Sequence, residues 1–461
     1  MRCVYLVFAV ACGGNSTGDD LAIDVLTDTN PDPNIVEVTL VASAGTHEYL
    51  AGKPADIWGF RDGAIAGSKP TIPGPMIEAK LGDRVIVHFK NELPEHTTIH
   101  WHGLRVANSS DGTSASQIPV QPNESFDYDL EIIDSGLFWY HPHMHGDVQI
   151  EAGLYAPFLV HGPADAAIEV SADRVFVLDD VKLESSGKLS TRTDTLDLML
   201  GRQGNVIMVN GREKAAFSAA VGNGRERWRF VNSANGRYFN LELGRPFFVI
   251  GWDGGLVNAP YETDRLLIAP GERYEVLVDL DGEDGEKLVL RTVHYDRGHN
   301  IPDPGPIELF TVTLRPAAPA APLPTTWGQT APIAFDATTP RRRFVLEEDD
   351  SVPASPVFTI NTEAFPNVTP LNVRAGNVEV WEIENLAEMD HPFHLHGMFF
   401  QVLDANEQPI APLALKDTVN VPQETTLKFA VRYGEPGRWM FHCHILEHAE
   451  RGMMGELAVA P

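Results

Sequence analysis

A ten-residue segment that recurs along the chain constrains its fold more than any other feature. Residues 82–91 (GDRVIVHFKN) and 376–385 (GNVEVWEIEN) have the same length and the same alternation of side chains. A weaker middle copy ends at Asn232, where Trp228 and Phe230 alternate with arginines. Alternation with a period of two predicts a β-strand buried on one face. Three copies of one β unit predict three related domains.

Pairs of histidines stand at a fixed distance from the two outer copies. A His-x-His-Gly unit begins nine residues after each final asparagine, at His100 and at His394, whereas the middle copy has leucines at 241 and 243. Residues 136–143 (GLFWYHPH) and 437–444 (GRWMFHCH) also match, and each ends in such a pair. Alternate residues of a strand share a face, so each pair can hold metal. The eight residues are His100, His102, His141, His143, His394, His396, His442 and His444.

Cys443 lies between two of these histidines and therefore points to the opposite face of the strand. A cysteine, two histidines and a weak axial methionine are the ligands of a blue electron-transfer copper. His448 and Met453 follow Cys443, and His391 lies an odd number of residues before His394, so it can face away from that pair. We predict one blue copper site in the third domain and three further copper ions between the first and third domains.

Composition agrees with a fold of short strands. The chain of 461 residues contains 39 Gly and 34 Pro, with many short alternating runs and no long amphipathic helix pattern. These features are typical of antiparallel β-sandwiches, and the length suits three domains. A Pro/Ala-rich linker is predicted at residues 316–325. The predicted parts are a signal and tether at 1–30 and domains at 31–163, 164–318 and 319–461.

The motifs HWHG, WYHPH, HPFHLHG and HCHILEH with a following Met resemble those of the three-domain, laccase-like bacterial multicopper oxidases. The resemblance covers roughly residues 35–460 and implies an all-β fold of three cupredoxin-like Greek-key barrels with four copper ions. The family spacing favours Met453 over Met454 as the axial ligand. The implied ligands are His391, Cys443, His448 and Met453 for type 1 copper, His100 and His394 for type 2, and His102, His141, His143, His396, His442 and His444 for the type 3 pair.

The resemblance also implies a reaction. Phenols or aromatic amines would lose single electrons at the type 1 copper, and dioxygen would be reduced to water at the three-copper cluster. Electrons would pass from Cys443 through the adjacent peptide bonds to His442 and His444. The axial methionine indicates a modest rather than a very high potential.

Proton delivery is less clearly marked in the sequence. Asp111 matches an acidic residue near the type 2 copper of the family, and its alternative interpretation is a turn aspartate before Gly112. Many bacterial relatives have glutamate where this chain has Ala449. Asp111 and Glu450 are therefore the candidates for the proton route.

Several functions compete with a phenol oxidase. Cuprous ion oxidation for copper tolerance and bilirubin-oxidase-like activity stay as alternatives, although the ten methionines are scattered and form no Met-rich segment near the type 1 site. A nitrite-reducing or electron-carrying cupredoxin needs fewer histidines, and a copper-free relative would have gaps in the ligand set. The net charge of −29 disfavours nucleic-acid partners. We expect a monomer.

The N-terminus resembles a bacterial lipoprotein signal. Arg2 precedes an apolar run from Val4 to Ala11, which ends at Cys12. Lipidation of Cys12 would tether an exported protein in the periplasm or at the outer membrane, and a plain secretory signal is the alternative. With Cys3 removed and Cys12 lipidated, Cys443 is left as the free thiol and is interpreted as a metal ligand.

Overall fold

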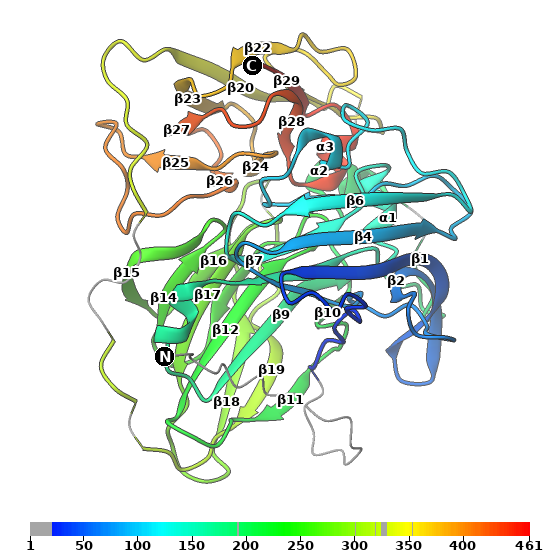
Figure 1. Cartoon of the computed structure of the whole chain (residues 1–461), viewed down its shortest axis with the longest axis vertical. Helices are drawn as coiled ribbons and strands as arrows, with labels where there is room; N and C mark the ends of the chain where they lie inside the picture. The colour runs from blue at the N-terminus through cyan, green and yellow to red at the C-terminus, as the bar shows by residue number, and fades with distance from the viewer. Residues whose placement is uncertain (1–20, 191–192, 300, 319, 324–329, 353) are drawn as a thin grey trace.

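We describe the protein from a computed structural model, which covers residues 21–190, 193–299, 301–318, 320–323, 330–352 and 354–461. Cys12 and the expected signal lie outside these residues, so the tether, like the monomeric state, stays a prediction. Three pairs of β-sheets follow one another along the chain, in blue and cyan, in green, and in yellow to red (Figure 1). None of the described helices is long and apolar enough to span a membrane.

The first pair of sheets contains four strands in each sheet. Their orders are β2-β1-β4-β6 and β3-β8-β7-β5. The bounds are β1 Ile35–Leu50, β2 Lys53–Asp62, β3 Ile77–Lys80, β4 Arg84–Asn91, β5 His100–His102, β6 Ser125–Glu131, β7 Gly136–His141 and β8 Ala156–His161.

The second pair has a six-stranded and a five-stranded sheet. Their orders are β10-β9-β12-β17-β14-β15 and β11-β19-β18-β13-β16. The bounds are β9 Ala172–Val181, β10 Val206–Val209, β11 Ala215–Ser218, β12 Arg225–Asn232, β13 Phe239–Glu242, β14 Phe247–Trp252, β15 Gly255–Thr263, β16 Leu266–Ile268, β17 Arg273–Asp279, β18 Lys287–Thr292 and β19 Ile307–Thr313.

The third pair has five strands in each sheet, and short helices lie between the strands of all three pairs. The orders are β21-β20-β23-β27-β25 and β22-β29-β28-β24-β26. The bounds are β20 Arg341–Asp349, β21 Val357–Ile360, β22 Leu371–Arg374, β23 Val378–Asn385, β24 His391–Leu395, β25 Phe400–Leu403, β26 Thr418–Val421, β27 Thr426–Arg432, β28 Gly437–Cys443 and β29 Met454–Ala460. The helices are η1 Asn108–Ser110, α1 Gly146–Gln149, η2 Pro163–Ala167, α2 Thr195–Leu200 and α3 Leu446–Glu450.

The repeat predicted from sequence occupies the same place in each pair of sheets. Strands β4, β12 and β23 each pair in parallel with the first strand of their sheet and antiparallel with a later one. Each ends in a buried asparagine whose side-chain amide donates to two or more backbone carbonyls farther along the chain, at Asn91, Asn232 and Asn385. Because a buried amide must find partners, this asparagine fixes the turn that starts the next segment.

The middle pair of sheets uses the same unit for packing alone. Leu241 and Leu243 stand where the outer copies have histidines, and both are buried in the core of the second pair. Burial of a leucine side chain contributes about 1.5–3 kcal/mol. Trp228 and Trp381, each four residues before the final asparagine, fill the cores of the second and third pairs.

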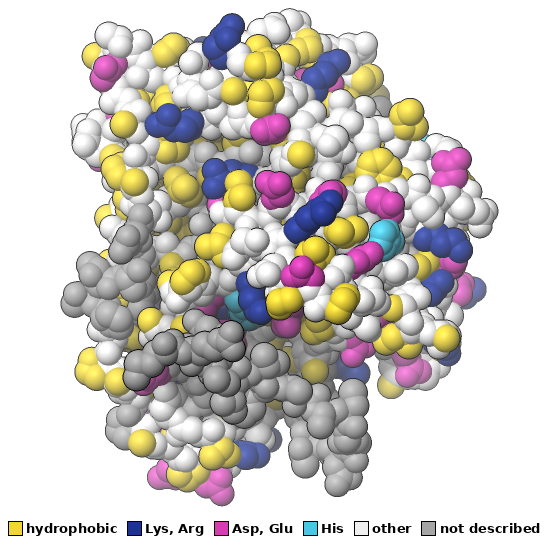
Figure 2. All heavy atoms as spheres, in the orientation of Figure 1, with side chains coloured by type: hydrophobic (Ala, Val, Ile, Leu, Met, Phe, Trp, Pro, Cys, Tyr) yellow, Lys and Arg dark blue, Asp and Glu magenta, His cyan; other side chains and the backbone are white. Residues whose placement is uncertain are grey.

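Acidic and basic side chains are mixed on the visible surface. Figure 2 shows Asp and Glu interspersed with Lys and Arg, and neither sign forms a continuous patch on that face. His88 pairs with two carboxylates, Glu37 at 2.9 Å and Asp127 at 2.8 Å. It lies on β4, whereas the predicted ligands His100, His102 and His141 lie on β5 and β7.

Candidate metal centres

Backbone pairing places the predicted histidine pairs side by side. In the first pair of sheets, β5 lies against β7 so that His100 is opposite His141. In the third pair, β24 lies against β28 so that His394 is opposite His442. Residues directly opposite one another in an antiparallel ladder project their side chains to the same face. The register of these two ladders therefore gathers the histidines of each outer domain on one face.

The two sets meet in what we call the histidine cluster, made of the eight paired histidines. All are buried except His143, which is partly buried. Ring nitrogens lie within 4.8 Å of one another in groups that combine both ends of the chain. The groups are His100, His102 and His394; His102, His141 and His444; and His143, His396 and His442. The structure thus brings together all eight residues between the first and third pairs of sheets.

The nitrogens of the cluster fit metal ligation. Backbone carbonyls hold one side of the rings, since His100 Nδ1 lies 2.8 Å from the Asp111 oxygen and His141 Nδ1 lies 2.9 Å from the Pro142 oxygen. The opposite Nε2 atoms of His100 and His141 are buried without a partner among the described residues. An unpaired buried nitrogen is costly unless a ligand such as a metal ion binds it. Anchoring one nitrogen while the other faces the ion is the usual arrangement of a metal-binding histidine.

Burial favours the neutral form of His442 and His444. It lowers the pKa of His442 to about 3 and holds the pKa of His444 well below its usual value. A neutral imidazole keeps an electron pair for a metal ion, whereas a protonated one does not. These two imidazoles can therefore bind a cation at neutral pH without first losing a proton.

The other predicted centre, which we call the Cys443 site, consists of His391, Cys443 and His448. Cys443 Sγ lies 3.5 Å from His391 Nδ1 and 3.9 Å from His448 Nδ1, and the two nitrogens are 3.3 Å apart. One sulfur and two imidazoles in a triangle match the ligands of a blue copper site. Burial raises the pKa of the Cys443 thiol well above its usual range, so a bound cation is needed to keep it as thiolate.

Met453 and Met454 occupy different surroundings. Met453 is fully buried in the apolar cluster that contains Cys443, and its backbone carbonyl accepts from the Cys443 N–H at 3.0 Å. Met454 lies at the start of β29 and packs in a separate cluster with Met440. The surroundings of the two side chains favour Met453 as the residue beside the Cys443 site.

A helix of the second domain covers the outer side of the Cys443 site. His448 Nε2 lies 3.0 Å from the backbone oxygen of Met199, in α2. Phe358 stacks on the His448 ring with centroids 3.8 Å apart. These contacts fix the ring so that its Nδ1 faces Cys443 Sγ and His391. No sequence pattern marks Met199, because the contact is made by its backbone.

The two candidates for a proton route lie in different places. Both carboxylate oxygens of Asp111 lie 3.2 Å from His396 Nδ1, and the Asp111 side chain is buried in the cluster. Glu450 instead accepts from the Gly146 N–H at 2.7 Å and joins α3 to α1. Burial raises the pKa of the Glu450 carboxyl. Among the described residues, only Asp111 of these two contacts a predicted ligand.

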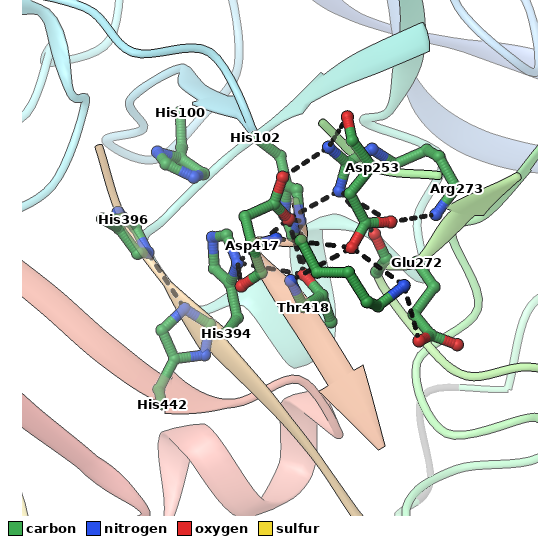
Figure 3. A network of polar contacts seen from close by, with 12 residues as sticks. His100, His102, Asp253, Glu272, Arg273, His394, His396, Asp417, Thr418 and His442 are labelled. Carbon is green, nitrogen blue, oxygen red and sulfur yellow. Dashed lines mark hydrogen bonds and ion pairs between the residues drawn. The ribbon is translucent and has the colours of Figure 1, made fainter. Parts of the chain in front are cut away.

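Asp417 is a cluster contact that the sequence did not reveal. Its carboxylate lies 3.2 Å from His102 Nε2, and its backbone oxygen lies 3.0 Å from His394 Nδ1 (Figure 3). Burial would raise the pKa of Asp417, but the Arg273 guanidinium overrides that effect and holds the pKa well below its usual range. The carboxylate is therefore charged, and it orients one histidine from each outer domain.

The second domain contributes to the cluster through this aspartate. Arg273 of β17 donates to both Asp417 oxygens, at 2.6 and 2.5 Å. Asp253 accepts from the Arg273 backbone N–H at 2.8 Å (Figure 3). Its carboxylate also pairs with Lys416 at 3.2 Å. Lys416 also pairs with Glu272 at 3.1 Å. The middle domain holds no predicted ligand, yet its charged side chains fix the positions of two of them.

Comparison with known proteins agrees with these centres. Sequence profiles described as multicopper oxidase match residues 58–165, 179–300 and 330–461. The multicopper oxidase MmcO of Mycobacterium tuberculosis is 30% identical over 84% of this chain and 81% of its own length. The chain belongs to the multicopper oxidases. The family implies four copper ions, and the two centres provide histidine and cysteine groups to bind them.

Solved multicopper oxidases share the whole fold. The chain is 28% identical to a structure described as a multicopper oxidase from Campylobacter jejuni, a metallo-oxidase, with a TM-score of 0.83 over 95% of this chain and 94% of that one. It is 27% identical to a laccase from Pediococcus acidilactici, with a TM-score of 0.83 over 97% and 95% of the two chains. The predicted fold of three cupredoxin-like domains is confirmed, and the protein is a copper-dependent oxidoreductase.

Proposed function

We propose that this multicopper oxidase is laccase-like and oxidises phenols or aromatic amines with dioxygen as the acceptor. Copper held by the Cys443 site would supply a one-electron oxidant, and copper held by the histidine cluster would supply the chemistry that converts dioxygen to water. In this proposal His391, Cys443, His448 and Met453 hold the type 1 ion. The remaining ions are held by His100 and His394 (type 2) and by His102, His141, His143, His396, His442 and His444 (type 3).

The chain itself connects and separates the two centres. Cys443 is covalently joined to His442 and His444, so the backbone of three residues links the Cys443 site to the cluster. Both centres are buried, which keeps an organic reductant away from the dioxygen site. Asp111 faces His396 Nδ1, and we assign its carboxylate to holding and passing protons at the cluster.

One observation favours an organic reductant. A cavity of about 420 Å³, which we call the Tyr238 pocket, is lined in part by Tyr238, which packs in the same apolar cluster as Cys443. That volume falls in the range of small-molecule sites. Its described lining residues include Tyr238 and Tyr295 but no methionine, cysteine, aspartate or glutamate. Thioethers and thiolates are the ligands that cuprous ions prefer, so this lining suits an aromatic ring better than a metal ion.

Oxidation of metal ions is the second candidate function. The Campylobacter jejuni protein is described as a metallo-oxidase, and its structure is as similar to this chain as the structure of the laccase is. The two functions differ in the reductant that consumes dioxygen. We expect oxygen uptake by the copper-loaded enzyme with methoxyphenols and phenylenediamines to exceed uptake with Cu(I). Oxygen-electrode measurements on a matched panel, corrected for uncatalysed oxidation, decide this. Faster uptake with Cu(I) than with every aromatic compound would reject the laccase-like proposal.

Exchange of the axial methionine provides a test of the type 1 assignment. Met453→Leu removes a thioether that stabilises the oxidised ion, so we expect a higher reduction potential with the blue colour retained. Met454→Leu removes the same group from the neighbouring position and is the matched control, with no expected change. Redox titration of both variants gives the answer. A raised potential in Met454→Leu alone would show that Met454, and not Met453, is the axial ligand.

A further inference from the structure

A buried arginine in the Tyr238 pocket has unused hydrogen-bond donors. Arg297 is 2% exposed, lines the pocket, and donates from Nη2 to the backbone oxygen of Leu200. Its guanidinium also lies over the Tyr238 ring, 5.5 Å from the centroid. The Nε and Nη1 atoms have no hydrogen-bond partner among the described residues. A buried cation with free N–H groups is costly unless an anion binds there.

The other arginine that lines the pocket, Arg237, has an ion-pair partner, unlike Arg297. Arg237 pairs with Asp180 at 2.5 Å and donates to the Gly204 oxygen, so its charge is balanced. Arg297 has no ion pair within 4.0 Å among the described residues. The described lining also contains no acidic residue, in a chain with a net charge of −29. The Arg297 charge is therefore not balanced by an acidic residue of the pocket lining, although the protein as a whole is acidic.

Three contacts connect the wall of this pocket to the Cys443 site. The Arg297 backbone oxygen accepts from the N–H of Asp390, the residue before His391. Arg297 donates to the backbone oxygen of Leu200. The preceding residue, Met199, contacts His448 through its own backbone oxygen. Tyr238 packs in the same apolar cluster as Cys443. A molecule bound against Arg297 and Tyr238 thus lies next to the electron-accepting centre.

The remaining surfaces of the pocket suit a flat ring. Tyr238 and Tyr295 are stacked with centroids 5.8 Å apart and an interplanar angle of 23°. Both hydroxyls are fixed, Tyr238 to Asn420 at 2.9 Å and Tyr295 to Asp390 at 2.7 Å. Ile301, Pro302 and Pro304 add apolar surface. Rigid aromatic and apolar walls beside one cation are complementary to an aromatic acid.

We propose that the Tyr238 pocket binds phenols that carry a carboxylate, such as hydroxybenzoates, with the free Arg297 N–H groups donating to the carboxylate. This inference rests on the proposed laccase-like function and names its substrate class. In the reaction the phenol group loses one electron to the oxidant of the Cys443 site and one proton to water at the pocket mouth. A phenoxyl radical leaves, and the carboxylate is unchanged.

Equilibrium binding tests the pocket without turnover. The probes are benzoate, benzamide and acetate, titrated into the copper-loaded enzyme by calorimetry. Hydrogen bonds between a guanidinium and a carboxylate are stronger than those to a neutral amide, so we expect benzoate to bind at least about tenfold more tightly than benzamide. We expect acetate to bind more weakly than benzoate as well, because it lacks the ring. Equal affinity for benzoate and benzamide, or for benzoate and acetate, would overturn the inference.

Two variants assign the binding to Arg297. Arg297→Gln should remove the preference for benzoate over benzamide. Gln203→Glu adds a carboxylate to the partly exposed lining while leaving Arg297 in place, and should weaken benzoate binding without disturbing the core. Arg432→Gln removes the same charge from the exposed surface and is the matched control. A benzoate preference that survives Arg297→Gln would overturn the inference. If that variant fails to fold, unchanged benzoate affinity in Gln203→Glu would overturn it.

Turnover separates this inference from the proposed function. Syringate and its methyl ester differ only in the charged group, and we expect Arg297→Gln to lower kcat/KM for syringate at least about tenfold relative to the ester. Rapid oxidation of both phenols with an unchanged ratio would overturn the inference and leave the laccase-like function intact. Arg297-dependent benzoate binding in an enzyme that oxidises neither phenol would reject the proposed function itself.

Discussion

Replacing Cys443 with serine is expected to abolish the blue colour and the oxidation of aromatic substrates. A serine hydroxyl does not ionise near neutral pH, so it cannot replace the thiolate between His391 and His448. The same change removes the sulfur from the only covalent connection proposed between the Cys443 site and His442 and His444. The histidine cluster does not include Cys443, so its metal should stay bound.

Metal analysis and spectroscopy check this result. The native enzyme should bind about four copper ions per chain and Cys443→Ser about three, with loss of the thiolate absorption band. Met454→Leu, in which all proposed ligands remain, should keep four ions and the band. Near-normal phenol turnover by Cys443→Ser would contradict the proposed path, and one or two ions in the native enzyme would contradict the assignment of the histidine cluster.

Replacing Asp417 with alanine is expected to destabilise the fold and the cluster together. Arg273 would lose its bidentate partner and keep only the longer ion pair to Asp253 at 3.6 Å, and breaking a buried pair costs up to about 3–5 kcal/mol. His102 and His394 would also lose a partner that orients their rings (Figure 3). Loss of such a partner typically weakens metal affinity by about 10–100-fold. We therefore expect a lower thermal midpoint and incomplete copper loading.

Two comparison variants make this expectation specific. Asp417→Asn keeps the shape and part of the hydrogen bonding, so it should lose less copper than Asp417→Ala. Asp281→Ala removes an exposed partner of Arg245, and a surface pair of this kind contributes at most about 1 kcal/mol. Thermal denaturation and copper titration of the three variants give the order. Asp417→Ala with native copper affinity and a native midpoint would show that the network does not support the cluster.

The sequence by itself determined the repeated β unit and the positions of the predicted ligands. Strand periodicity decides which side chains share a face, so the split between His442, His444 and the intervening Cys443 follows from local geometry alone. The same reasoning separates His391 from His394. Each of these assignments depends on neighbours within a few residues, which is the range over which a sequence pattern carries structural information.

The tertiary structure decided how the second domain acts on the copper centres. Asp417 reaches His102 across 315 positions of the chain, and Arg273 reaches Asp417 across 144. Met199 contacts His448 through a backbone oxygen, and Arg297 lies in a pocket whose walls come from separate strands and loops. None of these contacts leaves a periodic signal, because each depends on how whole domains pack. The predicted ligands could therefore be assigned from the sequence, whereas the residues that orient them and line the Tyr238 pocket are brought together only when the three domains pack.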